Sequence, residues 1–226
     1  MEIILIILAI LPVAVLLWIV YRKDHDPEPL RTVGFAFLWG CVSVVPAILG
    51  EWIASFDNTF LDATLGVAII EELVKLAVLM LYIWRHADFN DSFDAIVYSV
   101  TVSLGFATVE NIMYVVNGGL SVAILRALLS IPGHATFAII MGYFFAKAKT
   151  HFYYQRKNKQ YAYLALSLLI PTLIHGIYDF LVISCETNNS LVILVLAFSI
   201  VVDVICFVLL HNAAKNDKPM VQDIER

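Results

Sequence analysis

Charged residues are scarce in this sequence. Asp, Glu, Lys and Arg make up 15% of its 226 residues, whereas hydrophobic residues make up 61% and the mean hydropathy is +0.86. Soluble domains contain roughly 45–50% apolar residues, so this composition excludes an ordinary soluble protein. The chain also lacks a polar stretch that could fold by itself, since its loops reach about a dozen residues at most. We therefore expect an integral membrane protein whose function lies within the membrane bundle.

Several familiar motifs are absent as well. Neither His-Glu-x-x-His nor Gly-x-Ser-x-Gly occurs, which excludes the common zinc-protease helix and the serine-hydrolase elbow. Only three cysteines are present, Cys41, Cys185 and Cys206, and their spacing fits neither a disulfide framework nor a zinc site. The net charge of −5 comes without any basic stripe, so no nucleic-acid partner is predicted.

Seven apolar segments are long enough to cross a bilayer, which takes about 20 mainly apolar residues per helix. Their approximate limits are 2–21, 31–54, 63–84, 93–116, 120–147, 160–184 and 190–211. The sequence thus predicts an all-α fold, a polytopic bundle of about seven transmembrane helices, in the cell membrane and in contact with membrane lipid. The membrane domain would cover residues 1–212 and a short tail residues 213–226. We interpret the first segment as a retained anchor, because no basic residue precedes it and no small-x-small cleavage site follows it.

The basic residues predict the orientation of this bundle. All of the 14 Lys and Arg residues except Lys75 and Arg126 lie in the loops 22–31, 85–92 and 147–159 or in the tail. Basic residues in short loops are retained on the cytoplasmic side. We therefore expect the N-terminus outside the cell and the C-terminus in the cytoplasm.

Glycine and proline residues predict where the apolar helices turn or kink. The pair Gly118-Gly119 predicts a tight turn, which makes the spans on either side of it antiparallel neighbours. Pro46, Pro132 and Pro171 fall inside spans, and each removes a helix hydrogen bond, so they predict kinks.

Ionisable side chains stand inside the spans, although each costs about 2.5–3.5 kcal/mol at the middle of a membrane helix. They are Glu71, Glu72, Lys75, Glu110, Arg126, His134, His175, Asp179 and Asp203. Such residues normally face the interior of a bundle and mark a functional pathway. We expect most of them to serve a site, while Asp203, alone on the last span, is interpreted as a structural hydrogen-bonding group.

Helical spacing brings two groups of these side chains together. Lys75 lies about 40° from Glu71 and about 60° from Glu72 around the helix, so its ammonium can contact both carboxylates. A neutralising ion pair is the simpler reading, but two carboxylates against one cation leave a negative charge that suits acid-base chemistry. His175 and Asp179 also share a face, and the carboxylate can fix the tautomer of the imidazole.

Estimated depth places these groups in one half of the bilayer. At about 1.5 Å per residue from the outer end of each span, Glu72 and His175 lie roughly 14 Å deep, Glu110 roughly 9 Å, Asp179 roughly 8 Å and His134 roughly 20 Å. We infer one water-accessible cavity that opens outward. Arg126 and Glu51 are expected near its mouth, or paired with each other. Phe106, one turn from Glu110, is interpreted as a packing residue.

Carboxylates and histidines around water form a hydrolytic arrangement, in which a Glu takes a proton while a His or a metal stabilises the oxyanion. Two other classes stay open. Acidic and imidazole groups in kinked helices also build proton or ion transporters, although no inverted repeat is visible in this sequence. His134 and His175 could alternatively be the axial ligands of a haem.

Four elements in this order resemble the motif set of the PrsW family of intramembrane proteases, which are distantly related to the CAAX prenyl endopeptidases. They are Glu71-Glu72-x-x-Lys75, Phe106-x-x-x-Glu110, the isolated His134 and His175-x-x-x-Asp179, and they span a motif core of residues 63–184. The resemblance implies hydrolysis of a peptide bond in a membrane-anchored protein near the outer face. Such a cut is typically the first one in a regulator such as an anti-sigma factor.

The resemblance also implies roles for the site residues. By similarity, Glu71 or Glu72 would activate water, with Lys75 beside them, and His175 with Asp179 would stabilise the oxyanion. In a metal version of the mechanism, Glu110, His134 and His175 would bind zinc. In a metal-free version, Glu71 and Glu110 would handle the proton and the histidines the oxyanion, without a cofactor.

Overall fold

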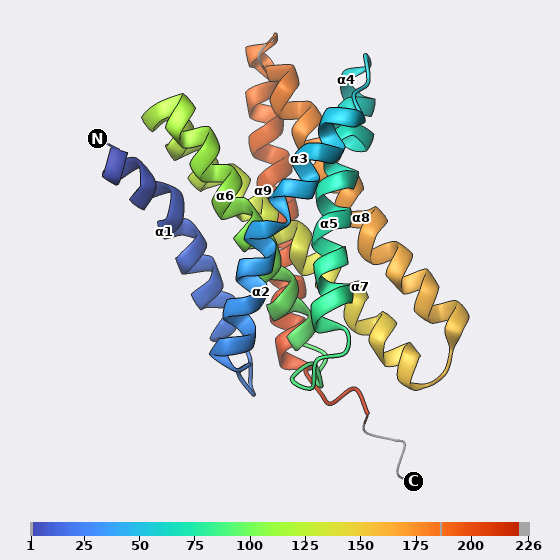
Figure 1. Cartoon of the computed structure of the whole chain (residues 1–226). Helices are drawn as coiled ribbons and strands as arrows, with labels where there is room; N and C mark the ends of the chain where they lie inside the picture. Colours follow the sequence, from blue (N-terminus) through green and yellow to red (C-terminus); the bar gives the residue numbers. More distant parts are fainter. Residues whose placement is uncertain (1, 186, 222–226) are drawn as a thin grey trace.

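The computed structural model describes residues 2–185 and 187–221, which fold into a bundle of helices (Figure 1). Within these residues no strand is formed, and a single isolated bridge joins Asp91 to Pro219. The elements in chain order are α1 (Glu2–Tyr21), α2 (Leu30–Val42), α3 (Val44–Ile53), α4 (Thr59–Leu61), η1 (Asp62–Ala68), α5 (Ile69–Val78), η2 (Leu79–Ile83), α6 (Asp94–Leu125), η3 (Arg126–Ser130), α7 (Ile131–Tyr153), α8 (Lys157–Cys185), η4 (Asn189–Leu191) and α9 (Val192–Lys215). The predicted all-α fold is confirmed.

Four of the helical segments are long and apolar enough to cross a membrane: Leu30–Ile53, Asp94–Tyr153, Lys157–Cys185 and Asn189–Lys215. A shorter apolar helix covers Leu5–Tyr21. The segment that carries Glu71, Glu72 and Lys75 is also helical, but its three charges set it apart from the ordinary apolar spans. The structure therefore shows a multi-pass helical membrane protein.

The long segment Asp94–Tyr153 is an antiparallel hairpin. Its backbone is helical throughout except at Gly119, where φ is 71° and ψ is −158°, a conformation that only glycine adopts readily. Hydrogen bonds pair Ser103 with the carbonyl of His134, and Asn111 with Arg126, so the two arms run in opposite directions around this turn. The turn predicted from Gly118-Gly119 is confirmed, and it is what brings α6 and α7 together.

Helix breaks lie beside two of the three prolines expected to cause kinks, Pro46 and Pro132, whereas α8 stays a single helix through Pro171. Pro46 has no N–H to donate to the carbonyl of Val42, and α2 ends there before α3 begins at Val44. Pro132 likewise follows the wide π-helical turn η3. Two more π-helical segments, η1 and η2, flank α5 on both sides, a type of irregularity that is frequent at functional sites.

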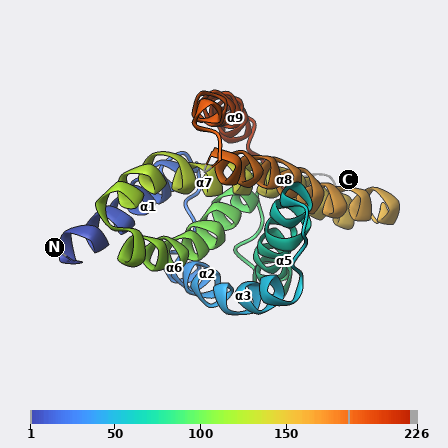
Figure 2. The ribbon, with the colours of Figure 1, turned by 90° about the horizontal axis from the view of Figure 1, so that it is seen from above.

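The first half of α6 is the centre of the bundle, since residues 93–108 are all buried. Close approach of α2 makes this possible, because a Cβ added to Gly40 would clash with the backbone of Val102. Seen from above, α9 lies at the edge beside α7 and α8 (Figure 2). There Asp203 accepts a hydrogen bond of 2.7 Å from Thr136, which confirms the structural interpretation of this carboxylate.

Candidate functional site

The polar face predicted on α5 is present. The ammonium of Lys75 donates to Oε2 of Glu71 at 3.0 Å and to Oε1 of Glu72 at 2.9 Å. All three residues are buried, with relative exposures of 5% for Glu71, 0% for Glu72 and 1% for Lys75. A cation held this far from water requires both carboxylates, because a buried charge without a partner is strongly destabilising.

Lys75 reaches beyond its own helix. Its Nζ lies 3.4 Å from Nδ1 of His134 on α7, and 4.4 Å from the ring centre of Phe106 on α6. A lysine ammonium has three N–H donors, so Glu71, Glu72 and His134 use all of them. Since ammonium only donates, Nδ1 of His134 acts as the acceptor, and the ring proton of a neutral imidazole is then on Nε2.

The other nitrogen of His134 faces Glu110 on α6. The distance from Nε2 to Oε2 of Glu110 is 2.8 Å, and Nη2 of Arg126 lies 3.0 Å from the same oxygen. Arg126 also donates through Nε to Asn111 at 2.8 Å. Of the two alternatives expected for Arg126 and Glu51, the pairing is not formed, because the hairpin turn places the guanidinium beside Glu110.

His175 on α8 lies between two carboxylates. Its Nδ1 is 3.0 Å from Oε1 of Glu72, and its Nε2 is 3.3 Å from Oδ2 of Asp179 one turn away. The imidazolium form satisfies both contacts, since each ring nitrogen then carries a proton. Phe137 stacks on the ring with centroids 4.7 Å apart, which fixes the plane of the imidazole.

Tight packing of α8 against η1 positions this histidine. Gly176, the next residue, has no room for a side chain, because an added Cβ would lie 2.6 Å from Oγ1 of Thr64. The absence of a Cβ lets α8 approach the segment that leads into Glu71 and Glu72. Nothing in the sequence indicates this contact, since it depends on the spacing between two helices.

The two halves of the site meet. The rings of His134 and His175 are 5.5 Å apart between centroids, so side chains from α5, α6, α7 and α8 form a single cluster. We call Glu71, Glu72, Lys75, Glu110, His134, His175 and Asp179, together with Arg126, the carboxylate–imidazole cluster. It contains four carboxylates against two permanent cations, and this excess of negative charge favours a further cation or an imidazolium.

Exposure within the cluster is uneven. The side chains of Glu110, Arg126 and Asp179 are 16%, 15% and 22% exposed, while those of Glu72 and His175 are 1% and 4% exposed. The cluster is therefore nearest to the surface on the side formed by the first three residues. Oε2 of Glu72 is buried inside and has no hydrogen-bond partner among the described residues, so its lone pairs are free to accept.

Two sets of ligand atoms in the cluster lie close enough to hold a metal ion. Glu71, Glu72 and His175 form one set, and Glu71, Glu110 and His134 form the other, with all ligand atoms of a set within 4.8 Å of one another. Imidazole nitrogen and carboxylate oxygen are donors that zinc accepts. The unpartnered Oε2 of Glu72 adds an acceptor, so the residues present fit a metal. His175, expected from the sequence to join Glu110 and His134, instead belongs to the set with Glu72.

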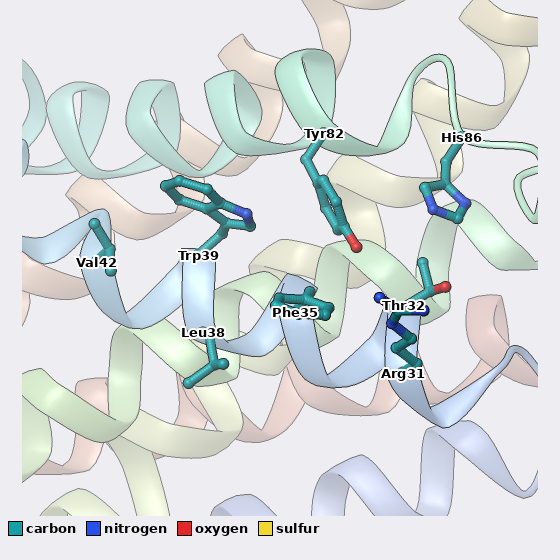
Figure 3. A pocket seen from close by; sticks show the side chains of 8 residues that line it. All are labelled: Arg31, Thr32, Phe35, Leu38, Trp39, Val42, Tyr82 and His86. Carbon is teal, nitrogen blue, oxygen red and sulfur yellow. The ribbon is translucent and has the colours of Figure 1, made fainter.

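A separate groove lies between α2 and η2 and is lined by none of the cluster residues (Figure 3). Its volume is about 720 Å³, and its walls are mostly apolar side chains of α2 such as Phe35, Leu38 and Trp39. Figure 3 shows Tyr82 and His86 facing them from the other side. The groove opens to the apolar surface of the bundle, so it is distinct from the polar cluster.

Known proteins resemble this chain along most of its length. Residues 28–210 match the family described as PrsW family intramembrane metalloprotease. The chain is 36% identical to Protease PrsW of Oceanobacillus iheyensis over 211 residues, which cover 92% of this chain and 94% of the relative. It is 39% identical to Protease PrsW of Geobacillus kaustophilus, with 77% of each chain covered, and 37% identical to that of Bacillus subtilis, with 76% and 79% covered. No solved structure matches the chain.

Proposed function

Because the chain belongs to the PrsW family of intramembrane proteases, we propose that its carboxylate–imidazole cluster hydrolyses a peptide bond in a membrane-anchored protein near the extracytoplasmic face. The protein is an intramembrane peptidase of a multi-pass membrane family. One observation carries the assignment of the site: Glu72 with His175, and Glu110 with His134, come from four different helices and meet within one cluster. Family membership favours this activity over the transporter and haem alternatives.

In the proposed reaction Glu72 is the general base. Its free Oε2 takes a proton from the attacking water, whose oxygen forms a bond to the carbonyl carbon of the scissile peptide. The same proton then passes to the nitrogen of the leaving amine as the C–N bond breaks. Lys75 keeps Glu72 ionised before the reaction, since its ammonium lies 2.9 Å from Oε1.

His175 is the proposed donor to the oxyanion. Its contact with Asp179, at 3.3 Å, is longer than its contact with Glu72, at 3.0 Å. The Nε2–H is therefore the donor that can most easily exchange its acceptor, from the carboxylate of Asp179 to a carbonyl oxygen of the substrate. Asp179 is partly exposed, so it can take up solvent contacts once the substrate replaces it. Hydrogen bonds of this kind are worth about 2.7–4 kcal/mol in the transition state.

The metal that the family description implies would be held by Glu71, Glu110 and His134. A zinc ion there would polarise the scissile carbonyl and lower the pKa of the attacking water. Arg126 orients Glu110, and Lys75 orients Glu71. Zinc at Nε2 of His134 would require the ring proton to be on Nδ1, so Lys75 would then no longer donate to this histidine. The sequence-based set, with His175 as third ligand, is replaced in this proposal because His175 already contacts Glu72 and Asp179.

We also propose that the bundle crosses the membrane seven times, with the N-terminus outside and the C-terminus in the cytoplasm. The hairpin turn at Gly119 and the basic loops then lie on opposite sides, as the distribution of Lys and Arg favours. In this orientation the partly exposed side of the cluster faces outward. A membrane-anchored regulator such as an anti-sigma factor, cut just below the outer surface, fits this placement.

Cleavage of a co-expressed single-span substrate tests the proposal. We expect Glu72→Gln and His175→Ala to abolish the cut, while Asp26→Asn, at an exposed position of the loop between α1 and α2, retains it. Membrane insertion of each variant, followed by fractionation, separates loss of chemistry from loss of fold. Full activity in both Glu72→Gln and His175→Ala would contradict the assignment.

Metal analysis of protein purified without a histidine tag separates the two mechanisms. Stoichiometric zinc that is lost in Glu110→Gln and retained in the exposed control Asp26→Asn would support Glu71, Glu110 and His134 as the ligands. A metal-free wild-type enzyme with full activity would exclude this ligand set and leave the metal-free mechanism.

A further inference from the structure

A second group of carboxylates lies away from the carboxylate–imidazole cluster. Asp24 and Glu28 belong to the loop between α1 and α2, and Asp94 is the first residue of α6. One oxygen from each lies within 4.8 Å of the other two. We call these three residues the loop-end acidic cluster. All three are buried, with exposures of 8%, 4% and 1%.

No basic side chain pairs with the loop-end acidic cluster in the part of the chain that the structure describes. Glu28 accepts a hydrogen bond from the hydroxyl of Tyr98, and Asp94 accepts two from the backbone N–H groups of Asn90 and Asp91, at 2.9 and 2.6 Å. Buried carboxylates normally require a cation as well, because hydrogen bonds alone compensate only part of the desolvation.

Asp24 supplies the observation that points to a ligand. Its Oδ1 accepts from the N–H of Asp26 at 3.1 Å, but Oδ2 is fully buried and has no partner among the described residues. This oxygen belongs to a carboxylate that lies beside two others, so it is available as a ligand. The donor set consists of oxygen alone, whereas both candidate sets of the carboxylate–imidazole cluster contain a histidine.

Neighbouring charges strengthen this argument. Burial raises the pKa of Asp24 to about 6, and nearby Asp217, Asp26 and Asp91 contribute to the increase. Burial likewise raises the pKa of Glu28 to about 7, with Asp24 among the contributing charges. Ionising Asp24 and Glu28 near neutral pH therefore costs desolvation free energy, and a bound cation would offset this cost.

We propose that the loop-end acidic cluster binds a hard divalent cation of the magnesium and calcium class. Oxygen-only sites with several carboxylates select these ions over zinc or copper, which favour nitrogen and sulfur. The cation would tie the loop between α1 and α2 to the start of α6. Backbone and side-chain contacts from Ser92 and Phe93 to Asp217 extend this connection to the chain after α9.

Luminescence of Tb³⁺, a calcium surrogate, tests the site in the full-length protein after chelation with EDTA. Tyr98, whose hydroxyl contacts Glu28, would sensitise a bound Tb³⁺ ion. We expect saturable luminescence that Ca²⁺ or Mg²⁺ displaces and that Asp24→Asn reduces at least tenfold. Asp26→Asn is the matched control, because it makes the same change at an exposed position of the same loop.

Tb³⁺ bound at the loop-end acidic cluster must be distinguished from Tb³⁺ bound at the carboxylate–imidazole cluster. Glu110→Gln should retain the luminescence, since it removes a ligand of that cluster only. In wild-type protein, Ca²⁺ or Mg²⁺ added after chelation should also raise the melting temperature, which needs no variant. Equal luminescence in Asp24→Asn and Asp26→Asn, or a wild-type melting temperature indifferent to both ions, would overturn the proposal and indicate that protons alone neutralise these carboxylates.

Discussion

Nδ1 of His175 lies 3.0 Å from Oε1 of Glu72, although the two residues are 103 positions apart in the sequence. Glu72 is also held by Lys75 from its own helix, so a single buried carboxylate joins the ammonium to the imidazole. The same two contacts thus balance the charge of Glu72 and hold the side chains of Lys75 and His175 in position. Any change that disturbs one of the three groups should affect the other two.

Lys75→Met should destabilise the protein. Removing the ammonium leaves Glu71 and Glu72 buried without their shared cation, and breaking a buried ion pair costs about 3–5 kcal/mol. We expect a lower melting temperature in detergent and less protein in the membrane. Lys157→Met, at an exposed position, is the control and should melt like the wild type. A Lys75→Met variant as stable as this control would show that the trio is not held by its charges.

Gly176→Ala should reduce activity through packing alone. The added Cβ would lie 2.6 Å from Oγ1 of Thr64 and 2.8 Å from its Cα, so α8 must move away from η1 and take His175 with it. Overpacking of this kind costs about 1–3 kcal/mol. Gly34→Ala makes the same change where nothing lies within 4 Å, and it should leave both the cleavage rate and the melting temperature unchanged. Equal behaviour of the two variants would contradict the close approach of α8 and η1.

The loop-end acidic cluster predicts how stability depends on pH in the absence of divalent cations. Burial raises the pKa of Asp24 from 3.8 to about 6 and that of Glu28 from 4.5 to about 7. The folded protein then binds more protons than the unfolded chain between about pH 4 and pH 7, so stability falls as pH rises through this window. Melting temperatures measured in EDTA should therefore decrease from pH 5 to pH 7.5, and less steeply in Asp24→Asn. A rising or flat profile would contradict the prediction.

Cys185 reports the orientation of the bundle. It is partly exposed at the end of α8, on the side that we propose to be extracytoplasmic. With Cys41 and Cys206 replaced by Ser, a membrane-impermeant maleimide should label intact cells through Cys185. Labelling that requires permeabilised cells would reverse the proposed topology.

The sequence predicts contacts well when both partners lie on one helix. Spacing of three or four residues was enough to bring Lys75 to Glu71 and Glu72, and His175 to Asp179, because helical geometry fixes these neighbours. Spacing gives no information about which helices face each other. The sequence therefore left open whether Arg126 pairs with Glu51, and it did not predict the contacts of Arg126 with Glu110 and of Lys75 with His134.

Depth along a straight helix predicts where the backbone lies, but not which side chains meet. Counting about 1.5 Å per residue separates Glu110 from His134 by about 11 Å, yet the two side chains are 2.8 Å apart. The hydrogen bond from Ser103 to the carbonyl of His134 places the backbone of His134 seven residues from Glu110 along α6, so the two side chains span the distance. The prediction that Glu110 and His134 belong to one site has a different basis. An ionisable side chain inside a span normally faces the interior of the bundle and not the lipid.

A double-mutant comparison in reconstituted liposomes can decide whether Glu72 and His175 act as one catalytic unit. Cleavage rates of a single-span substrate would be measured for the wild type, Glu72→Gln, His175→Ala and the combined variant, with Asp203→Asn as the control. Each single change should lower the rate by about 10²–10⁴-fold, and the combined variant should be no slower than the slower single variant, because groups that act together are lost together. Losses that multiply in the combined variant would show that the two residues work independently and would contradict the proposed mechanism.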